Sequence, residues 1–211
     1  MNLGMSESTS EFVERYLSQT AEIAAATSRQ DVARVIDVLF AAYEQDRTIY
    51  TCGNGGSAAN ASHLACDIAK FTWVDGKRRF RCQSLCDNAA LISALTNDVG
   101  FGLIFLEQLR GKVLAGDVLV CISVHGGSGE DKAGPWSQNL LSAAEYAKGC
   151  GAKIVGLVGY DGGAIAKMAD AAIVVPAAND GTTSTPHVEG FHEIYHHLIC
   201  QRLLDRVQAD G

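Results

Sequence analysis

The heptapeptide Cys-Gly-Asn-Gly-Gly-Ser-Ala at residues 52–58 decides the fold, because it separates two segments of opposite character. Residues 48–52 are β-branched, aromatic or small and carry no charge, which predicts a short buried strand. Residues 58–65 are rich in alanine, which predicts a helix. The chain therefore passes from a strand through a glycine turn into a helix.

This turn has the composition of a phosphate-binding site. Its glycines remove the side chains that would keep an anion away from the backbone, and the free N–H groups at a helix start favour negative charge. Asn54 and Ser57 add side-chain donors. The turn thus predicts a phosphate cradle made by Asn54, Gly55, Gly56 and Ser57, although a tight turn without a ligand has the same local signature.

The helix that follows the turn carries two residues of catalytic type. His63 and Asp67 are four positions apart and therefore lie on one face. An imidazole and a carboxylate in this arrangement can bind a metal ion or move protons beside a bound phosphate. An exposed ion pair without further function is the alternative.

Composition limits the class of protein. The chain has 211 residues, of which 47% are hydrophobic, and a net charge of −7, which suits one globular domain and leaves no nucleic-acid footprint. No apolar run approaches ~18 residues, so no membrane span is expected, and no secretory signal is apparent. The seven scattered cysteines are typical of unpaired thiols in a cytoplasmic protein.

Hydrophobic periodicity places two helices, at residues 9–28 and 30–43, before the first strand, with Ser10 as the N-cap of the first. These two helices cannot cover a whole sheet. A face that they leave uncovered would suit a partner subunit, so we expect an oligomer. Further strands are predicted at 79–85, 117–123, 153–158 and 172–175, and further helices at 89–95, 101–109, 139–150, 164–170 and 188–207.

The alternation of apolar strands with helices indicates an α/β fold with a parallel sheet covered on both faces. We expect a single domain with a helical N-terminal extension at about 9–46 and an αβ core at about 47–207. Ligands of such sheets bind at the carboxyl ends of strands. A second glycine-rich turn follows the strand at 117–123 and offers Ser123, His125 and Ser128, so two turns converge on one anion.

The last helix carries a second group of residues whose side chains can act as acids, bases or metal ligands. Within about 140° of arc, at 100° per residue, it presents Glu189, His192, Glu193, His196 and His197. Residues 192–196 match the HExxH pattern of zinc proteases. A zinc protease needs a third ligand, usually downstream, and the residues after His196 offer only Asp205 and Asp210. A solvated helix face is the other alternative.

Taken in order, residues 52–58, 97–101, 122–128, 161–163 and 188–200 resemble the sugar isomerase (SIS) domain family. More closely, they are similar to the phosphoheptose isomerases, which convert sedoheptulose 7-phosphate to a heptose 7-phosphate. The resemblance covers about residues 10–205. It implies a flavodoxin-like three-layer αβα sandwich, a homotetramer, and active sites at subunit interfaces that often hold zinc.

The resemblance also assigns residues to roles. The cradle residues of the family correspond to Asn54, Ser57, Ser123 and Ser128, and its Asn-Asp pair corresponds to Asn97 and Asp98. Its metal and catalytic residues correspond to His63, Asp67, Glu189 and His197.

Several positions depart from the family. Asp67 is a methylene shorter than the family's glutamate, Glu189 adds a charge where the family has glutamine, and His125 replaces a hydroxyl. Phe71 stands where the family has a basic residue. These changes suit an isomerase of sedoheptulose 7-phosphate, or one of a different seven- or eight-carbon or modified sugar phosphate.

For the chemistry we expect Asp67 to be the base and His197 the acid of an enediol(ate) mechanism. A zinc ion, or another divalent cation, would be held by His63, Asp67, Glu189 and His197. Glu189 and His197 would be about 12 Å apart along one helix. Either the helix begins after Glu189 or a neighbouring subunit supplies one of the two. A non-catalytic SIS module that binds a sugar phosphate or a protein is the competing class.

Overall fold

The computed structural model describes residues 7–127 and 137–209, and it confirms the predicted order of helices and strands. In chain order the elements are α1 (Thr9–Ala26), α2 (Arg29–Glu44), β1 (Thr48–Gly53), α3 (Gly56–Lys70), β2 (Arg81–Ser84), α4 (Ala89–Asp98), the 3₁₀ turn η1 (Phe101–Leu103), α5 (Ile104–Leu109), β3 (Val118–Ser123), α6 (Gln138–Gly149), β4 (Lys153–Val158), α7 (Gly163–Met168), β5 (Ala171–Val174) and α8 (Thr185–Ala209).

The five strands form one parallel sheet in the order β2-β1-β3-β4-β5. This is the flavodoxin-like order, in which the connections change direction between β1 and β3. The carboxyl ends of β1 and β3 therefore open a crevice, and both predicted glycine turns follow these two strands. The topology thus brings the turns together, as the sequence predicts.

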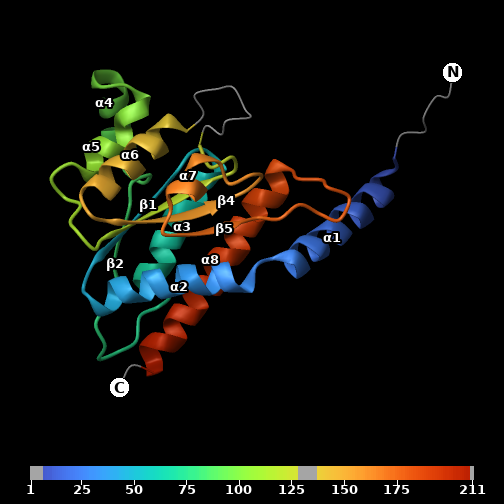
Figure 1. The fold of residues 1–211 in the computed structure, drawn as a ribbon, viewed down its shortest axis with the longest axis horizontal. Coiled ribbons are helices and arrows are strands. Elements are labelled where there is room, and N and C mark those ends of the chain that lie inside the picture. Colours follow the sequence, from blue (N-terminus) through green and yellow to red (C-terminus); the bar gives the residue numbers. More distant parts are fainter. Residues whose placement is uncertain (1–6, 128–136, 210–211) are drawn as a thin grey trace.

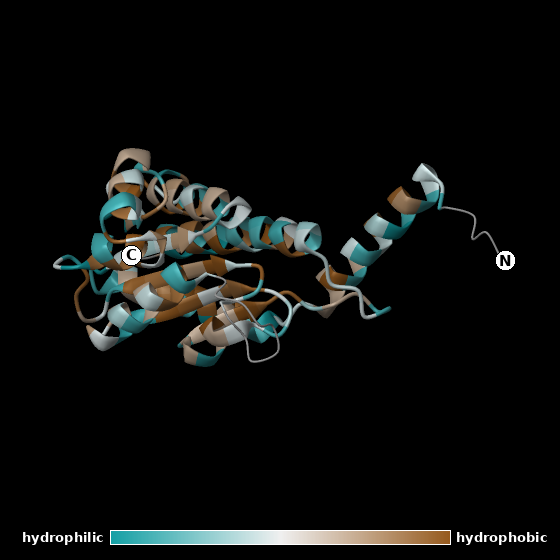
Figure 2. Cartoon of the chain, turned by 90° about the horizontal axis from the view of Figure 1, so that it is seen from above, coloured by the Kyte–Doolittle hydropathy of each residue, from teal (hydrophilic) through white to brown (hydrophobic). Residues whose placement is uncertain are grey.

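Alternating side chains of the strands feed two separate cores, one on each face of the sheet. In β1, Ile49 joins the core beneath α2, α3 and α8, whereas Tyr50 joins the core beneath α5 and α6. In β3, Val118 and Leu119 divide in the same way. Figure 1 shows the two helical layers on either side of the sheet, and Figure 2 shows the brown, apolar strands between them. The fold is the expected three-layer αβα sandwich.

Helix α1 projects away from the rest of the molecule, as both views show (Figures 1 and 2). Large apolar side chains on it are left exposed, with Leu17 at 62% and Phe12 and Val13 at 47% each. An exposed stripe of this kind on one helix is unusual for a surface that faces only water.

Local differences from the predicted elements concern helix ends. Ser8, not Ser10, is the N-cap of α1: its hydroxyl accepts from the backbone N–H of Glu11, and the Glu11 carboxylate accepts from the Ser8 N–H. This reciprocal capping box satisfies two otherwise unpaired donors, which Ser10 could not do from inside the helix. The predicted helix at 101–109 is divided into η1 and α5.

Across the described part of the chain, none of the helices is long and apolar enough to cross a lipid bilayer.

Candidate active site

A small pocket lies where the two glycine turns meet at the ends of β1 and β3. It has a volume of about 110 Å³. Its walls are mostly polar and come from four places in the chain: Asn54, Ser57, Ser123, Val124, His125, Ser137 and Glu189. The crevice at the change of strand direction is the place where sheets of this order bind their ligands.

The first turn is shaped by close backbone packing. A Cβ atom on Gly53 would collide with the backbone carbonyl of Ser57, so only glycine fits at the end of β1. Gly55 has φ +56° and accepts the first helical hydrogen bonds, from the N–H groups of Ala58 and Ala59. The N–H groups of Gly56 and Ser57 are thus left at the helix start without intrahelical partners, as an anion cradle requires.

The Glu189 side chain occupies the space beside this helix start. A Cβ atom on Gly56 would lie 2.6 Å from both carboxylate oxygens of Glu189, so the glycine permits the close approach. The backbone carbonyl of Glu189 accepts a hydrogen bond of 3.1 Å from the side-chain amide of Asn60. The Glu189 side chain therefore lies beside the predicted phosphate cradle.

Other predicted cradle residues are placed as follows. The Asn54 amide exchanges two hydrogen bonds with Asn139, at 2.8 and 2.9 Å, which orients it at the pocket. The Ser123 hydroxyl accepts from the N–H of Gly126 at 3.1 Å. His125 lies against the ring of Tyr160, with centroids 4.4 Å apart. Ser128 lies outside the described residues.

Asn97 and Asp98 are not brought to this pocket. They are the last two residues of α4, both are exposed, and the Asn97 amide donates to the Asp98 carboxylate at 2.9 Å. Neither lines the pocket between the turns.

A second group of residues, which we call the imidazole cluster, consists of His63, Asp67, His196 and His197. Ligand atoms of all four lie within 4.8 Å of one another. The Nε2 atoms of the three rings converge on Oδ2 of Asp67, at 3.2 Å from His196, 3.6 Å from His63 and 3.7 Å from His197. Three imidazoles and one carboxylate around a common point are a donor set that suits zinc.

Glu193 lies beside the imidazole cluster. Its Oε1 is 2.7 Å from Nδ1 of His63, and its Oε2 is 3.3 Å from Nδ1 of His196. Sequence analysis grouped Glu193 and His196 on the last helix without giving either a role. The sequence places Glu193, His196 and His197 on one face of the last helix, but helical spacing alone does not indicate that this face meets His63 and Asp67.

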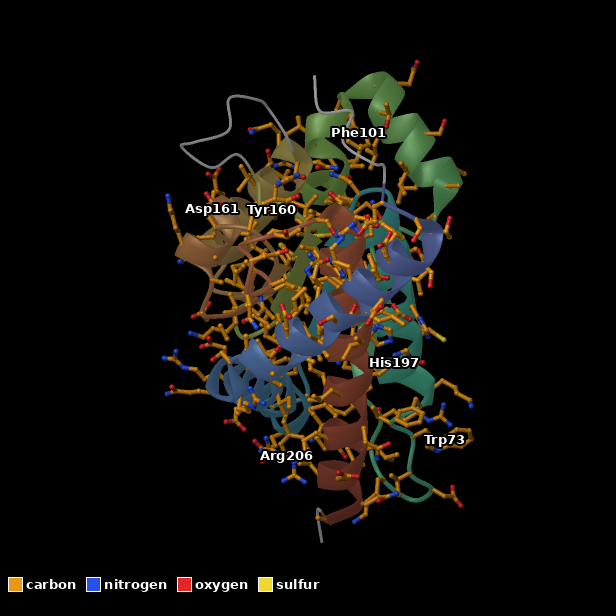
Figure 3. The ribbon with its side chains drawn as sticks, turned by 90° about the vertical axis from the view of Figure 1, so that its right-hand side faces the viewer. Trp73, Phe101, Tyr160, Asp161, His197 and Arg206 are labelled. Atoms are coloured by element: carbon orange, nitrogen blue, oxygen red, sulfur yellow. The ribbon has the colours of Figure 1, made fainter. Side chains whose placement is uncertain are left out.

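Burial differs within this group. His196 is fully buried, and burial lowers the pKa of its imidazole, partly offset by the Glu193 carboxylate. The rings of His63 and His197 are about half exposed, so the cluster opens to solvent on one side. Figure 3 shows His197 on α8, on the side of the helix toward α3.

His192 lies four residues before His196 on α8 but is not part of the imidazole cluster. It is fully buried, and burial lowers the pKa of its ring to about 4. Its neighbours along this stripe of α8, Val188 and Ile199, are core residues. The two histidines of the HExxH pattern thus do not join in one group, which rules out the zinc-protease interpretation.

Both the cradle and the imidazole cluster are built from the same two helices. α3 and α8 pack side by side and run in the same direction, because successive contacts advance together along both: Asn60 with Glu189, His63 with Glu193 and Asp67 with His196. α8 is continuous from Thr185, so it does not begin after Glu189. Within one chain, Glu189 and His197 are therefore held about 12 Å apart.

Comparison with known proteins places the chain in a family. Residues 12–159 match the model of the SIS domain. The chain is 40% identical to the lincomycin biosynthesis protein LmbN of Streptomyces lincolnensis, over 89% of this chain and 67% of that protein. It is 38% identical to a phosphoheptose isomerase of Nitratiruptor, over 75% of this chain and 77% of the relative.

Solved structures agree. The phosphoheptose isomerase GmhA of Neisseria gonorrhoeae superposes with a TM-score of 0.78 at 26% identity, over 93% of this chain and 98% of that one. The chain belongs to the SIS domain family, on the branch of the phosphoheptose isomerases.

Proposed function

We propose that this chain is an aldose–ketose isomerase that converts sedoheptulose 7-phosphate to D-glycero-D-manno-heptose 7-phosphate through an enediol(ate). The observation that carries the proposal is that α3 and α8 join an anion cradle to a cluster of imidazoles and a carboxylate. Membership of the phosphoheptose isomerase branch supports the same reaction.

The cradle binds the phosphate. Backbone N–H groups at the start of α3 favour an anion, and Asn54, Ser57 and Ser123 supply side-chain groups around the same pocket. His63 lies six residues along α3 from Ser57, a distance of about 9 Å along the axis. A substrate that spans both parts must carry its phosphate several carbons away from the reacting carbonyl, as a 7-phosphate does.

The imidazole cluster performs the proton transfers. Asp67 is the base that moves the proton between C1 and C2, and His197 is the acid for the carbonyl oxygen. The described contacts of Asp67 with the three rings all fall on Oδ2, which leaves Oδ1 for the substrate proton. Half-exposed His197 lies on the side that substrate can reach.

The same residues fit a zinc ion. The Nε2 atoms of three imidazoles and Oδ2 of Asp67 face one point. His63, Asp67 and His197 would hold the metal together with a fourth ligand. When bound, zinc polarises the carbonyl and hydroxyl oxygens of the substrate.

The chain assembles into a homotetramer whose active sites combine residues of neighbouring subunits. Support comes from the projecting α1 and from an adjacent apolar cavity of about 430 Å³, lined by residues that include Val32, Ile36, Ile194 and Leu198. A neighbouring subunit would cover the exposed side chains of Ile194 and Leu198, which follow Glu193 and His197 directly in the sequence of α8.

The chain forms one SIS domain, with the helical extension at 9–46 and the αβ core at 47–207, and it works in the cytoplasm. Free thiols throughout the described residues, among them exposed Cys66, support a reducing compartment.

A different seven- or eight-carbon or modified sugar phosphate is a second candidate substrate. The Glu189 carboxylate beside the cradle and His125 in the pocket favour it, since both change the polarity that the substrate meets. The 40% identity to a protein of lincomycin biosynthesis points in the same direction.

The test is isomerisation of sedoheptulose 7-phosphate in deuterated water, followed by NMR. Proton transfer through an enediol(ate) predicts an aldose product with deuterium at C2. Tight binding without turnover, for this sugar and for longer sugar phosphates, would contradict the proposal and favour a non-catalytic SIS module.

A further inference from the structure

Glu193 lies within ion-pair distance of all three rings of the imidazole cluster, and its Oε1 is 4.0 Å from Nε2 of His197. Its two oxygens lie 2.7 Å from Nδ1 of His63 and 3.3 Å from Nδ1 of His196. With each Nδ1 turned to Glu193, the Nε2 atoms face Asp67 Oδ2, at 3.6 and 3.2 Å. Carboxylates beside the second ring nitrogen of metal-binding histidines orient those rings. Glu193 stands at that position for both rings, at ion-pair distance, although Nδ1 of His196 is not aligned as a hydrogen-bond donor to it.

Glu189 does not reach the imidazole cluster within its own chain. It lies seven residues before His196 on continuous α8, which is about 10 Å along the axis. Its carboxylate is held against Gly56, and its backbone carbonyl against Asn60. The metal-ligating atoms that the structure gathers among described residues are those of His63, Asp67, His196 and His197.

We infer that His196, and not Glu189, is the fourth zinc ligand in this chain, that Glu193 is a positioning residue for His63 and His196, and that the Glu189 carboxylate stands beside the phosphate cradle and not at the metal. The inference deepens the proposed function and rests on it. His196 Nε2 is the ring nitrogen nearest to Asp67 Oδ2, and the side chain is fully buried, so its ring is held in place before any metal binds.

The chemistry of this set differs from one in which Glu189 is a ligand. Three imidazoles and one carboxylate form a softer and less negative donor set than two imidazoles and two carboxylates. Zinc and cobalt prefer imidazole, whereas manganese and magnesium prefer carboxylate oxygen. The site is therefore selective for zinc or cobalt over manganese.

The experiment measures metal binding to the full chain directly, by competition with a chromophoric chelator for Zn²⁺ and by visible absorption with Co²⁺. Glu193→Gln and Glu189→Gln form a matched pair, since both neutralise one carboxylate on the same helix, one turn apart. We expect Glu193→Gln to weaken zinc binding by about 10- to 100-fold and Glu189→Gln to leave it unchanged.

His196→Gln should weaken zinc binding by more than about 100-fold, beyond the effect of an outer-shell change, and alter the Co²⁺ spectrum. Because a buried substitution can disturb folding, NMR of the unsubstituted protein with ¹⁵N-labelled histidine gives an independent result. Zinc should shift the Nε2 signals of three rings. Shifts confined to two rings, or zinc binding lost in Glu189→Gln and kept in Glu193→Gln, would overturn the inference.

The metal-binding results can be distinguished from a failure of the proposed isomerase reaction. Zinc bound through three rings without turnover of sugar phosphates would leave the ligand set standing and contradict the isomerase. Turnover by a protein that binds no zinc would overturn the ligand set and leave the isomerase standing.

Discussion

The carboxylate of Glu189 lies over the backbone of Gly56, where an added Cβ atom would be 2.6 Å from both of its oxygens. Gly56 opens the helix that cradles the phosphate, so the protein holds a negative charge of its own beside the place where the substrate's phosphate would bind. A fixed like charge opposes a bound anion.

We therefore predict that Glu189→Gln binds inorganic phosphate about five- to tenfold more tightly, since a like charge removed from a partly solvated site contributes about 1 kcal/mol. Isothermal titration calorimetry measures this. Glu145→Gln, which neutralises an exposed glutamate on α6, is the charge-matched control and should show no change. Equal or weaker phosphate binding by Glu189→Gln would show that its carboxylate does not oppose the anion.

His197→Ala should separate catalysis from binding. Loss of the general acid is expected to lower kcat by about 100- to 10,000-fold, whereas affinity for inorganic phosphate should stay the same, because the cradle lies near the other end of α3. Steady-state kinetics and calorimetry on the same preparation give both values. Turnover equal to that of the unsubstituted protein would remove His197 from the mechanism.

Leu17→Asp tests whether the exposed face of α1 is covered by another subunit. A charge in place of an apolar side chain that is 62% exposed in the single chain should dissociate the oligomer and lower activity with it. Ser10→Asp, on the same helix, adds the same charge at an exposed polar position and serves as the control. An unchanged mass in analytical ultracentrifugation would mean that this face is free.

Burial of His192 should make the free energy of unfolding depend on pH. Its ring has a folded-state pKa of about 4, below the ordinary 6.5, so the unfolded chain takes up a proton first as pH falls. The free energy of unfolding should therefore fall between about pH 6.5 and 4, by about 3 kcal/mol from this residue at most. In urea unfolding of chelator-treated protein, His192→Leu should have a shallower acid slope. Parallel slopes for the two proteins would refute this.

Sequence patterns predicted the fold, and the strand–turn–helix geometry of the proposed cradle, because both depend on local signals. The glycine turn at residues 52–58 is set by backbone approach between Gly53 and Ser57, and the alternation of strands and helices fixes a parallel sheet. Even the misplaced N-cap had a local signal, since Ser8 and Glu11 have the spacing of a capping box.

The contacts of His196 and Glu193 could not be predicted in the same way. They depend on the register of α3 against α8, which is set by tertiary packing between segments more than 120 residues apart. The helical period of α8 places His192, Glu193, His196 and His197 within one arc of about 140°, and it does not say which of them is buried or which meets Asp67.

The measurement that tests the central claim most directly is turnover of sedoheptulose 7-phosphate by chelator-stripped protein, before and after zinc is returned, with bound metal assayed alongside. We predict little or no turnover without metal, and recovery as zinc binds at one ion per chain. Zinc bound at that ratio with no turnover of this sugar would contradict the assigned substrate. Neither bound zinc nor turnover would contradict the metal-dependent isomerase altogether.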